Sequence, residues 1–128
     1  MRALRRFEPY AYALVRVVGG LLFMFHGLQK FGFVGGQAVP LASLFGAAAI
    51  IELVGGALIL IGLATSPAAF VASGEMAYAY FTVHQPQGTW PIQNQGELAA
   101  LYAFLFLYIS TRGGGAFSVD GGGGKSRV

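Results

Sequence analysis

Long apolar stretches separated by short polar connections make up most of this chain, and their lengths predict its elements. Apolar residues dominate about 10–33, 41–63, 67–83 and 96–111. A helix needs about 20 mostly apolar residues to cross the ~30 Å hydrocarbon core of a bilayer. The runs are continuous rather than alternating, which argues against a transmembrane β-barrel. The pattern predicts four transmembrane helices, the last two short enough to begin in the headgroup region.

Composition supports a lipid environment. Charged residues make up 10% of the 128 residues and hydrophobic residues 55%, whereas an ordinary soluble domain is about 25% charged. A small soluble domain is mostly surface and could not cover it with so few charges. The chain has no cysteine, which removes disulfides, iron–sulfur clusters and thiolate-ligated haem. No basic stripe with interleaved aromatic residues is present, so we expect no nucleic-acid partner.

The basic residues orient the predicted helices. Cytoplasmic segments of membrane proteins carry an excess of Lys and Arg, and six of the eight basic residues here lie at the two ends: Arg2, Arg5, Arg6, Arg112, Lys125 and Arg127. Both ends are therefore expected inside, which requires an even number of spans. The expected fold is an all-α, four-helix membrane bundle over residues 1–112. A Gly-rich cytoplasmic tail follows over 113–128, and we expect its last residues to have no fixed structure.

Several ionisable side chains interrupt the apolar spans. A charge at bilayer depth costs at least ~2.5–3.5 kcal/mol and usually faces the bundle interior or a cavity. Spacing of three and four residues assigns each to an inward stripe. The stripes hold Arg16, Gly20, Phe23, Gly27 and Lys30, with His26 beside them; Glu52, Gly55, Gly56, Ile59 and Gly62; Ala72, Glu75, Tyr78, Ala79 and Thr82; and Glu97, Leu101, Phe104 and Tyr108.

The balance of these charges suggests chemistry. Two cations, Arg16 and Lys30, face three carboxyl groups, Glu52, Glu75 and Glu97. Burial favours the neutral form of the carboxyl that is left over, and such a group is a candidate proton carrier. Structural roles remain open beside this one. Glu52 and Glu75 could simply pair with Arg16, Lys30 could extend to the outer headgroups, and Glu97 could serve a helix N-terminus.

A set of motifs along nearly the whole chain resembles the DoxX family of small bacterial membrane proteins. The order and spacing of the motifs together carry the resemblance. They are HGLQK at 26–30 after Arg16 and Gly19–Gly20; Glu52, Gly55, Gly56 and LILIGL at 58–63; Glu75 and HQPQG at 84–88; NQGE at 94–97; LYAFLFLY at 101–108; and GGGAFSVDG at 113–121.

The resemblance implies a multi-pass protein of the bacterial inner membrane that belongs to a group commonly labelled oxidoreductases. Some relatives resemble the membrane subunit of a thiosulfate:quinone oxidoreductase. Others are associated with sulfurtransferase or superoxide-dismutase partners. The matching positions are His26, Lys30, Glu52, Glu75 and Glu97. We therefore expect a quinone-linked subunit whose electrons come from a soluble partner.

Candidate roles in such a site follow from side-chain chemistry. His26, Lys30, Tyr78 and Glu97 would donate hydrogen bonds to a quinone, while Glu52, Glu75 and His26 would carry protons. Haem is the weaker cofactor hypothesis, because it rests only on the similar depth of His26 and His84. No metal site is expected.

Two other classes of function remain open. In a membrane anchor or assembly factor, the ionisable residues would hold the bundle together and the SVD sequence at 118–120 would recruit a soluble protein. A small proton-coupled transporter ranks last, because the chain has no inverted repeat or broken helix. The sequence also leaves a homo-oligomer open.

Overall fold

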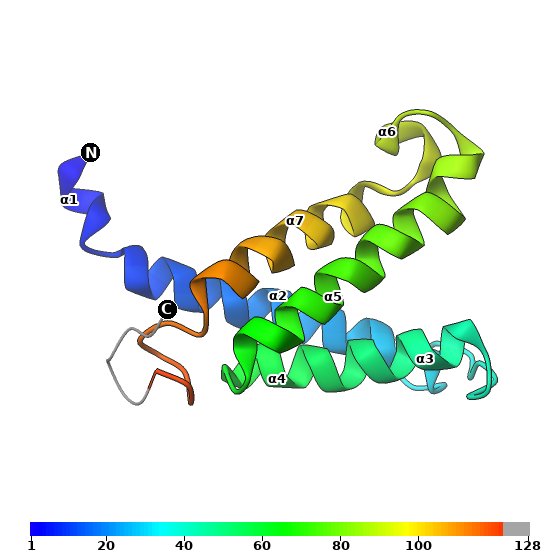
Figure 1. The fold of residues 1–128 in the computed structure, drawn as a ribbon, viewed down its shortest axis with the longest axis horizontal. Coiled ribbons are helices and arrows are strands. Elements are labelled where there is room, and N and C mark those ends of the chain that lie inside the picture. Colours follow the sequence, from blue (N-terminus) through cyan, green and yellow to red (C-terminus); the bar gives the residue numbers. More distant parts are fainter. Residues whose placement is uncertain (122–128) are drawn as a thin grey trace.

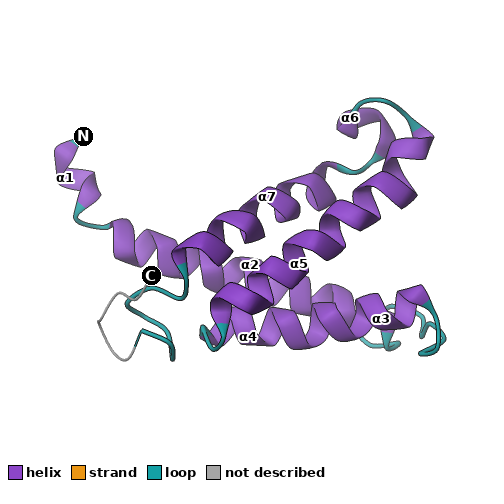
Figure 2. Cartoon of the chain, viewed as in Figure 1, coloured by secondary structure: helices purple, strands orange, loops and turns teal. Residues whose placement is uncertain are grey.

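The computed structural model describes residues 1–121, which are all helix and loop with no strand in that range (Figure 2). The predicted all-α class is confirmed for this part of the chain. The elements are α1 (Arg2–Arg5), α2 (Glu8–Lys30), α3 (Leu44–Ile50), the π-helical turn η1 (Ile51–Gly55), α4 (Gly56–Ile61), α5 (Thr65–Ala79), the π-helical turn η2 (Tyr80–His84), the 3-10 turn η3 (Gln85–Gln87), α6 (Pro91–Asn94) and α7 (Glu97–Arg112).

Left-handed backbone ends α2, and a capping side chain begins the next long helix. The chain leaves α2 after Lys30, and Gly32 then adopts φ +91° while Val34 adopts φ +53°. This left-handed backbone is incompatible with continuing the helix. The next helix starts at Leu44 because the Ser43 hydroxyl accepts a hydrogen bond from the Gly46 N–H at 3.1 Å, a typical N-cap.

Two helices have the length and apolar character to span a membrane. One is Glu8–Lys30 and the other is Leu44–Ile61, in which α3, η1 and α4 run on as one helix. The remaining long elements, α5 and α7, cover 15 and 16 residues, and η2 lengthens the first of them.

The long helices form two hairpins that meet at one end and diverge at the other. In the first, α2 packs against η1 and α4, and in the second, α5 packs against α7. A tight turn with Gly62 at φ +74° and Ala64 at φ +48° joins them. Figure 1 shows the hairpins close together near this turn and spread apart toward α3 and α6. The spread end is where a space between the hairpins can form.

Glycines let the two helices of the first hairpin touch. A Cβ atom added to Gly20 would lie 2.6 Å from the Leu60 nitrogen, and one added to Gly56 would lie 2.6 Å from the Met24 nitrogen. Small residues at a helix crossing permit such backbone contact in lipid. The prediction that Gly20, Gly55 and Gly56 face inward is confirmed, since all three are buried.

Aromatic rings fill the centre between the hairpins. Phe23 of α2 packs against Phe106 of α7 with ring centroids 4.8 Å apart, and Tyr102 stacks on Phe106 at 5.2 Å. Phe23 and Phe106 are fully buried, as are Ile59 of α4 and Ile109 of α7. Offset aromatic pairs of this kind add to the free energy of area burial. They hold the two hairpins together midway along their length.

The inward face predicted for α7 is wrong. Leu101, Phe104 and Tyr108 are 64%, 74% and 51% exposed, and Glu97 is exposed as well. The face that packs inward carries Ala99, Tyr102, Phe106 and Ile109. Because α7 is apolar almost all the way round, its pattern does not select a face. Glu97 misled the prediction because it begins the helix rather than lying inside it.

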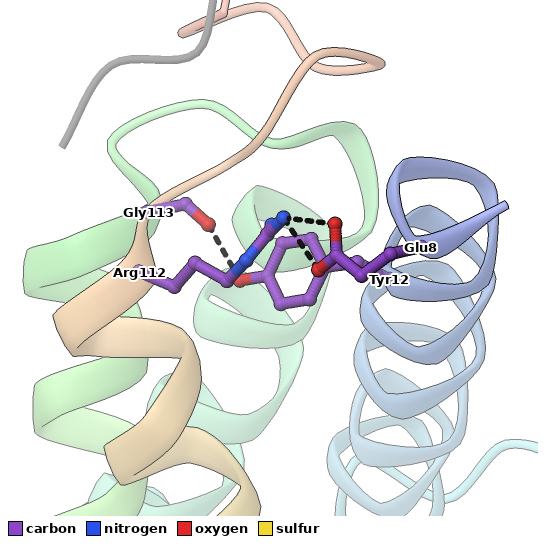
Figure 3. Close-up of polar contacts among 4 residues, drawn as sticks. All are labelled: Glu8, Tyr12, Arg112 and Gly113. Atoms are coloured by element: carbon purple, nitrogen blue, oxygen red, sulfur yellow. Dashed lines mark hydrogen bonds and ion pairs between the residues drawn. The ribbon is translucent and has the colours of Figure 1, made fainter. Parts of the chain in front are cut away.

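Polar contacts tie the start of α2 to the end of α7. The Arg112 guanidinium forms an ion pair with Glu8 at 2.7 Å and lies 3.7 Å from the centre of the Tyr12 ring. The Tyr12 hydroxyl donates a hydrogen bond to the Gly113 carbonyl at 2.5 Å (Figure 3). These contacts place the start of α2 and the end of α7 at the same end of the molecule.

Residues 113–121 pack against that same end. Asp120 accepts hydrogen bonds from the N–H groups of Ala64 and Thr65 at 2.9 and 2.8 Å and so caps the start of α5. The Asp120 N–H donates to the Gly62 carbonyl at 2.8 Å. The first half of the Gly-rich tail is thus part of the folded protein. The end of the tail, expected to have no fixed structure, lies outside the described residues.

Candidate functional site

A cavity of about 840 Å³ lies between the hairpins at their spread end. This volume is in the range of small-molecule and cofactor sites, which are mostly apolar with a few convergent polar groups. Residues of α2, α3, η1, α5, η2 and α7 line it. Its polar side chains are His26, Lys30, Glu52, Glu75, Thr82, His84, Gln95 and the two tyrosines Tyr78 and Tyr102.

Lys30 and Glu52 form the central ion pair of the cavity. The Lys30 Nζ lies 2.6 Å from Glu52 Oε1, and their side chains are 27% and 2% exposed. Close packing sets this register, because a Cβ on Gly27 would lie 2.5 Å from the Leu53 nitrogen. Lys30 follows Gly27 by one turn on the same face. The alternative in which Lys30 extends to the outer headgroups is wrong, since its ammonium turns inward to Glu52.

Glu52 occupies an unusual backbone position. It lies in the π-helical turn η1, where one extra residue is accommodated in the helix. Such π-bulges are rare and often occur at functional sites. A second π-helical turn, η2, lies on the opposite hairpin and ends at His84, which also borders the cavity. Both irregular turns therefore contribute side chains to the same space.

The alternative in which Glu52 or Glu75 pairs with Arg16 is wrong. The Arg16 Nη1 donates to the carbonyls of Ile59 and Leu60 at 3.0 Å each, and its Nη2 donates to the Phe117 carbonyl at 2.7 Å. Arg16 is 1% exposed. These contacts hold together the end of the bundle near the α4–α5 turn. At ~1.5 Å per residue, Arg16 lies about 21 Å from Lys30 along α2. Lys30 is the cation left for the carboxyl groups of the cavity.

Three buried polar atoms of the cavity residues have no hydrogen-bond partner within residues 1–121: Glu75 Oε1, Glu75 Oε2 and the Tyr102 hydroxyl. We call these the open polar atoms. Glu75 lies close to the Glu52 carboxyl, to which it can donate when protonated, and within range of the Lys30 charge, so at least one of its oxygens stays without a partner. Because a buried polar atom without a partner costs about 1–3 kcal/mol, the open polar atoms mark the place where a bound molecule would be stabilised.

Tyr102 is the cavity residue that sequence reasoning missed. It is 4% exposed, and the His26 ring meets it edge-on with centroids 6.1 Å apart. Because α7 is apolar almost all the way round, the sequence holds no signal that selects Tyr102 as an inward residue.

The structure brings most of the predicted site residues together. His26, Lys30, Glu52, Glu75 and Tyr78 all border the cavity. Glu97 does not, because it lies at the exposed first residue of α7. Its place in the first turn of α7 agrees with the alternative in which it serves the helix dipole.

His84 lies at the end of the cavity near the α6 turn. Its Nδ1 is 3.1 Å from the Asn94 carbonyl oxygen. Asn94 is 1% exposed, and its side chain accepts a hydrogen bond from the Gly96 N–H at 2.8 Å while donating to the Gly88 carbonyl at 3.0 Å. Asn94 thus fixes the connection that holds His84. Over the described range, no group of three or more His, Cys, Asp and Glu side chains is arranged to hold a metal ion.

The rim of the cavity is apolar and exposed. Leu44 and Phe45 of α3 are 71% and 57% exposed, and Val71 and Tyr78 of α5 are 52% and 56% exposed. Exposed apolar surface of this kind on a rim is compatible with contact to lipid or to a lipophilic molecule. The cavity thus combines an apolar entrance with a polar interior.

Comparisons with known proteins show which family the chain is similar to. The sequence model of the DoxX family matches residues 11–85, which include His26, Lys30, Glu52 and Glu75. A protein of Haemophilus influenzae described as "Uncharacterized protein" is 41% identical over 128 aligned residues, covering 94% of this chain and 96% of that relative. No solved structure matches the chain.

Proposed function

The chain belongs to the DoxX family, and from that premise we propose that it is a multi-pass protein of the bacterial inner membrane whose cavity binds a quinone. In this proposal the long helical elements form four spans with both termini in the cytoplasm. Two spans have the required length and composition, and the two shorter ones pack against each other as a hairpin. The basic residues at both ends support the orientation.

The observation that carries the quinone proposal is the polar interior of an apolar cavity. A quinone needs an apolar slot, hydrogen-bond donors near its two carbonyl oxygens, and a group that exchanges protons. The His26 ring, the Lys30 ammonium and the Tyr102 hydroxyl all border the cavity and offer donors. The apolar rim supports entry of a lipophilic ring and tail from the bilayer.

Glu75 is the best candidate for proton exchange. One ammonium, that of Lys30, serves two carboxyl groups, and it is bonded to Glu52. A second negative charge beside that pair is unfavourable, which is why we assign proton exchange to Glu75 rather than to Glu52. A bound quinone would supply two-electron chemistry with proton uptake at its oxygens. The electrons would come from a soluble redox or stress-defence partner, because the sequence has no cysteine and no nucleotide-binding loop.

The proposal is tested by purifying the chain gently from its native membrane and identifying bound lipids by mass spectrometry, with an optical spectrum to detect a chromophore. We expect about one bound quinone per protein. In a Glu75→Gln or His26→Ala variant, the amount of bound quinone should fall at least about tenfold. Glu97→Gln is the matched control, because Glu97 lies outside the cavity lining. A preparation that lacks quinone but carries a soluble protein would support the anchor alternative instead.

The anchor alternative needs a different docking surface from the one that the sequence suggested. It relied on the SVD sequence at 118–120 to recruit a partner. The Ser118 hydroxyl donates to the Gly115 carbonyl at 2.7 Å, and the Asp120 carboxylate caps α5. Both side chains are thus engaged within the chain, which favours the cavity over the tail as the functional site.

A further inference from the structure

The open polar atoms of the cavity offer more acceptors than donors. Two of the open polar atoms are carboxyl oxygens of Glu75, and in either charge state at least one of them is an acceptor. The third is the Tyr102 hydroxyl, which both donates and accepts. A molecule that satisfies all three must therefore bring at least one donor of its own.

Lys30 does not relieve this shortage. One of its protons is used by Glu52 at 2.6 Å. Its side chain is 27% exposed, against 2% for Glu52, so its remaining protons are less shielded than the Glu52 carboxylate. The groups that are shielded and still lack a partner are therefore mainly acceptors. An oxidised quinone ring presents only two carbonyl acceptors, whereas the reduced ring presents two O–H donors.

We propose that the cavity binds the reduced hydroquinone form in preference to the oxidised quinone, with one O–H donated to Glu75 and one ring oxygen accepting from Tyr102. The inference rests on the proposed quinone function and specifies its ligand. A site built to hydrogen-bond a hydroxyl discriminates strongly against an analogue that lacks it, because the buried partner stays unsatisfied. We expect at least about tenfold tighter binding of the reduced form, since each tenfold step needs only ~1.4 kcal/mol.

The test measures how tightly the full chain, in detergent and without oxygen, binds three forms of the same ring. The probes are a decyl-substituted dimethoxy-methyl-benzoquinone, its hydroquinone, and the dimethyl ether of that hydroquinone, which has no O–H. Dissociation constants are obtained from the rise in unfolding temperature with ligand concentration. We expect the hydroquinone to bind at least about tenfold more tightly than both other probes.

Variants locate the donor preference. In Glu75→Met the side chain has no oxygen that can accept the hydroquinone O–H, so the ratio of the two constants should fall toward one. In Tyr102→Phe the affinity for the hydroquinone should fall, because one of its oxygens loses a donor. Glu97→Gln, at the exposed start of α7, should retain the preference. The dimethyl ether on the unmodified chain keeps the test decisive if either cavity variant fails to fold.

The possible results distinguish the preference for hydroquinone from the quinone site on which it depends. Equal binding of hydroquinone and quinone, or binding of the dimethyl ether as tight as that of the hydroquinone, overturns the donor preference and leaves a quinone site in place. No binding of any probe at saturating concentration overturns both. Preference for the hydroquinone that persists in Glu75→Met overturns the assignment of Glu75 as its acceptor.

Discussion

Lys30 is the residue on which the charge balance of the cavity depends. It is bonded to Glu52 and its charge also acts on Glu75. Arg16, the other cation of the first long helix, is occupied by backbone carbonyls at the far end. The two members of the ion pair are therefore not equivalent, since Glu75 offers Lys30 a second carboxyl whereas Glu52 has no second ammonium among the cavity-lining residues.

This asymmetry predicts that Lys30→Met destabilises the protein more than Glu52→Gln. Removing Lys30 leaves Glu52, which is 2% exposed, without a partner, and breaking a buried pair costs about 3 kcal/mol or more. Removing the Glu52 charge should cost about 1–2 kcal/mol, because Glu75 takes over as partner. Unfolding free energies in the same mixed micelles provide the measurement.

The double variant Lys30→Met/Glu52→Gln is the control for this prediction. It should recover part of the loss seen in Lys30→Met, because no buried carboxylate of the pair is left unpaired. A larger loss in Glu52→Gln than in Lys30→Met would show that Glu75 does not engage Lys30.

Asp120 predicts a dependence of stability on acid pH. Partial burial raises the pKa of its carboxyl, but hydrogen bonds from Thr65 and Ala64 and the charge of Arg16 outweigh burial and hold the pKa below its ordinary value. Because the folded-state pKa is the lower one, this contribution is fully present above about pH 4 and is lost as the pH falls through the folded value.

Asp120→Ala should therefore lower the unfolding free energy at neutral pH by about 1 kcal/mol, the usual effect of losing a helix cap. The difference from the unmodified chain should shrink below about pH 4. Val119→Ala is the matched control, since Val119 is 59% exposed and not titratable, and its effect should not change with pH. A difference for Asp120→Ala that stays constant down to pH 3 would contradict the cap.

At the scale of elements, the sequence predicted where apolar helices occur better than which faces they bury. The glycine faces around Gly20 and Gly56 were predictable, because small residues recur among larger ones and mark a contact. The face of α7 was not, because Leu, Phe and Tyr surround it almost evenly. The π-helical turns η1 and η2 could not be predicted either, since the apolar runs that contain them show no pattern that distinguishes a π-helical turn from an α-helix.

The crossing of α2 and α4 predicts a sharp contrast between glycines. In Gly20→Ala or Gly56→Ala, the new Cβ would lie 2.6 Å from a backbone nitrogen of the facing helix. The helices must then separate, at a cost of about 1–3 kcal/mol or more. Gly74→Ala is the matched control, since nothing lies within 4 Å of its added Cβ, and Ala is favoured over Gly in a helix by up to about 1 kcal/mol.

Thermal unfolding of the three variants in one detergent checks this contrast. We expect lower unfolding temperatures for the two crossing variants and an equal or higher temperature for Gly74→Ala. Equal effects at all three positions would mean that helix preference, rather than close contact of backbones, controls stability at the crossing.

At the scale of the whole molecule, the cavity depends on features that a single sequence does not contain. Its residues were predicted as separate inward stripes, and five of them do meet: His26, Lys30, Glu52, Glu75 and Tyr78. The ion pair between Lys30 and Glu52 required the register of two helices. The space itself required the angle between two hairpins, which is set by the tight turn after α4 and by the rings of Phe23 and Phe106. Neither quantity is encoded in a local pattern.

The start of α2 and the end of α7 meet through Glu8 and Arg112, which predicts that both face the same side of the membrane. The chain has no cysteine, so single cysteines can report this directly. Leu4→Cys and Val119→Cys, at residues 58% and 59% exposed, should be protected from an impermeant maleimide outside intact cells and react after lysis. Gln37→Cys and Thr89→Cys, at exposed positions in the opposite connections, should react before lysis.

Reaction of Val119→Cys but not Leu4→Cys in intact cells would require an odd number of spans. Reaction of both would reverse the orientation that the terminal arginines predict.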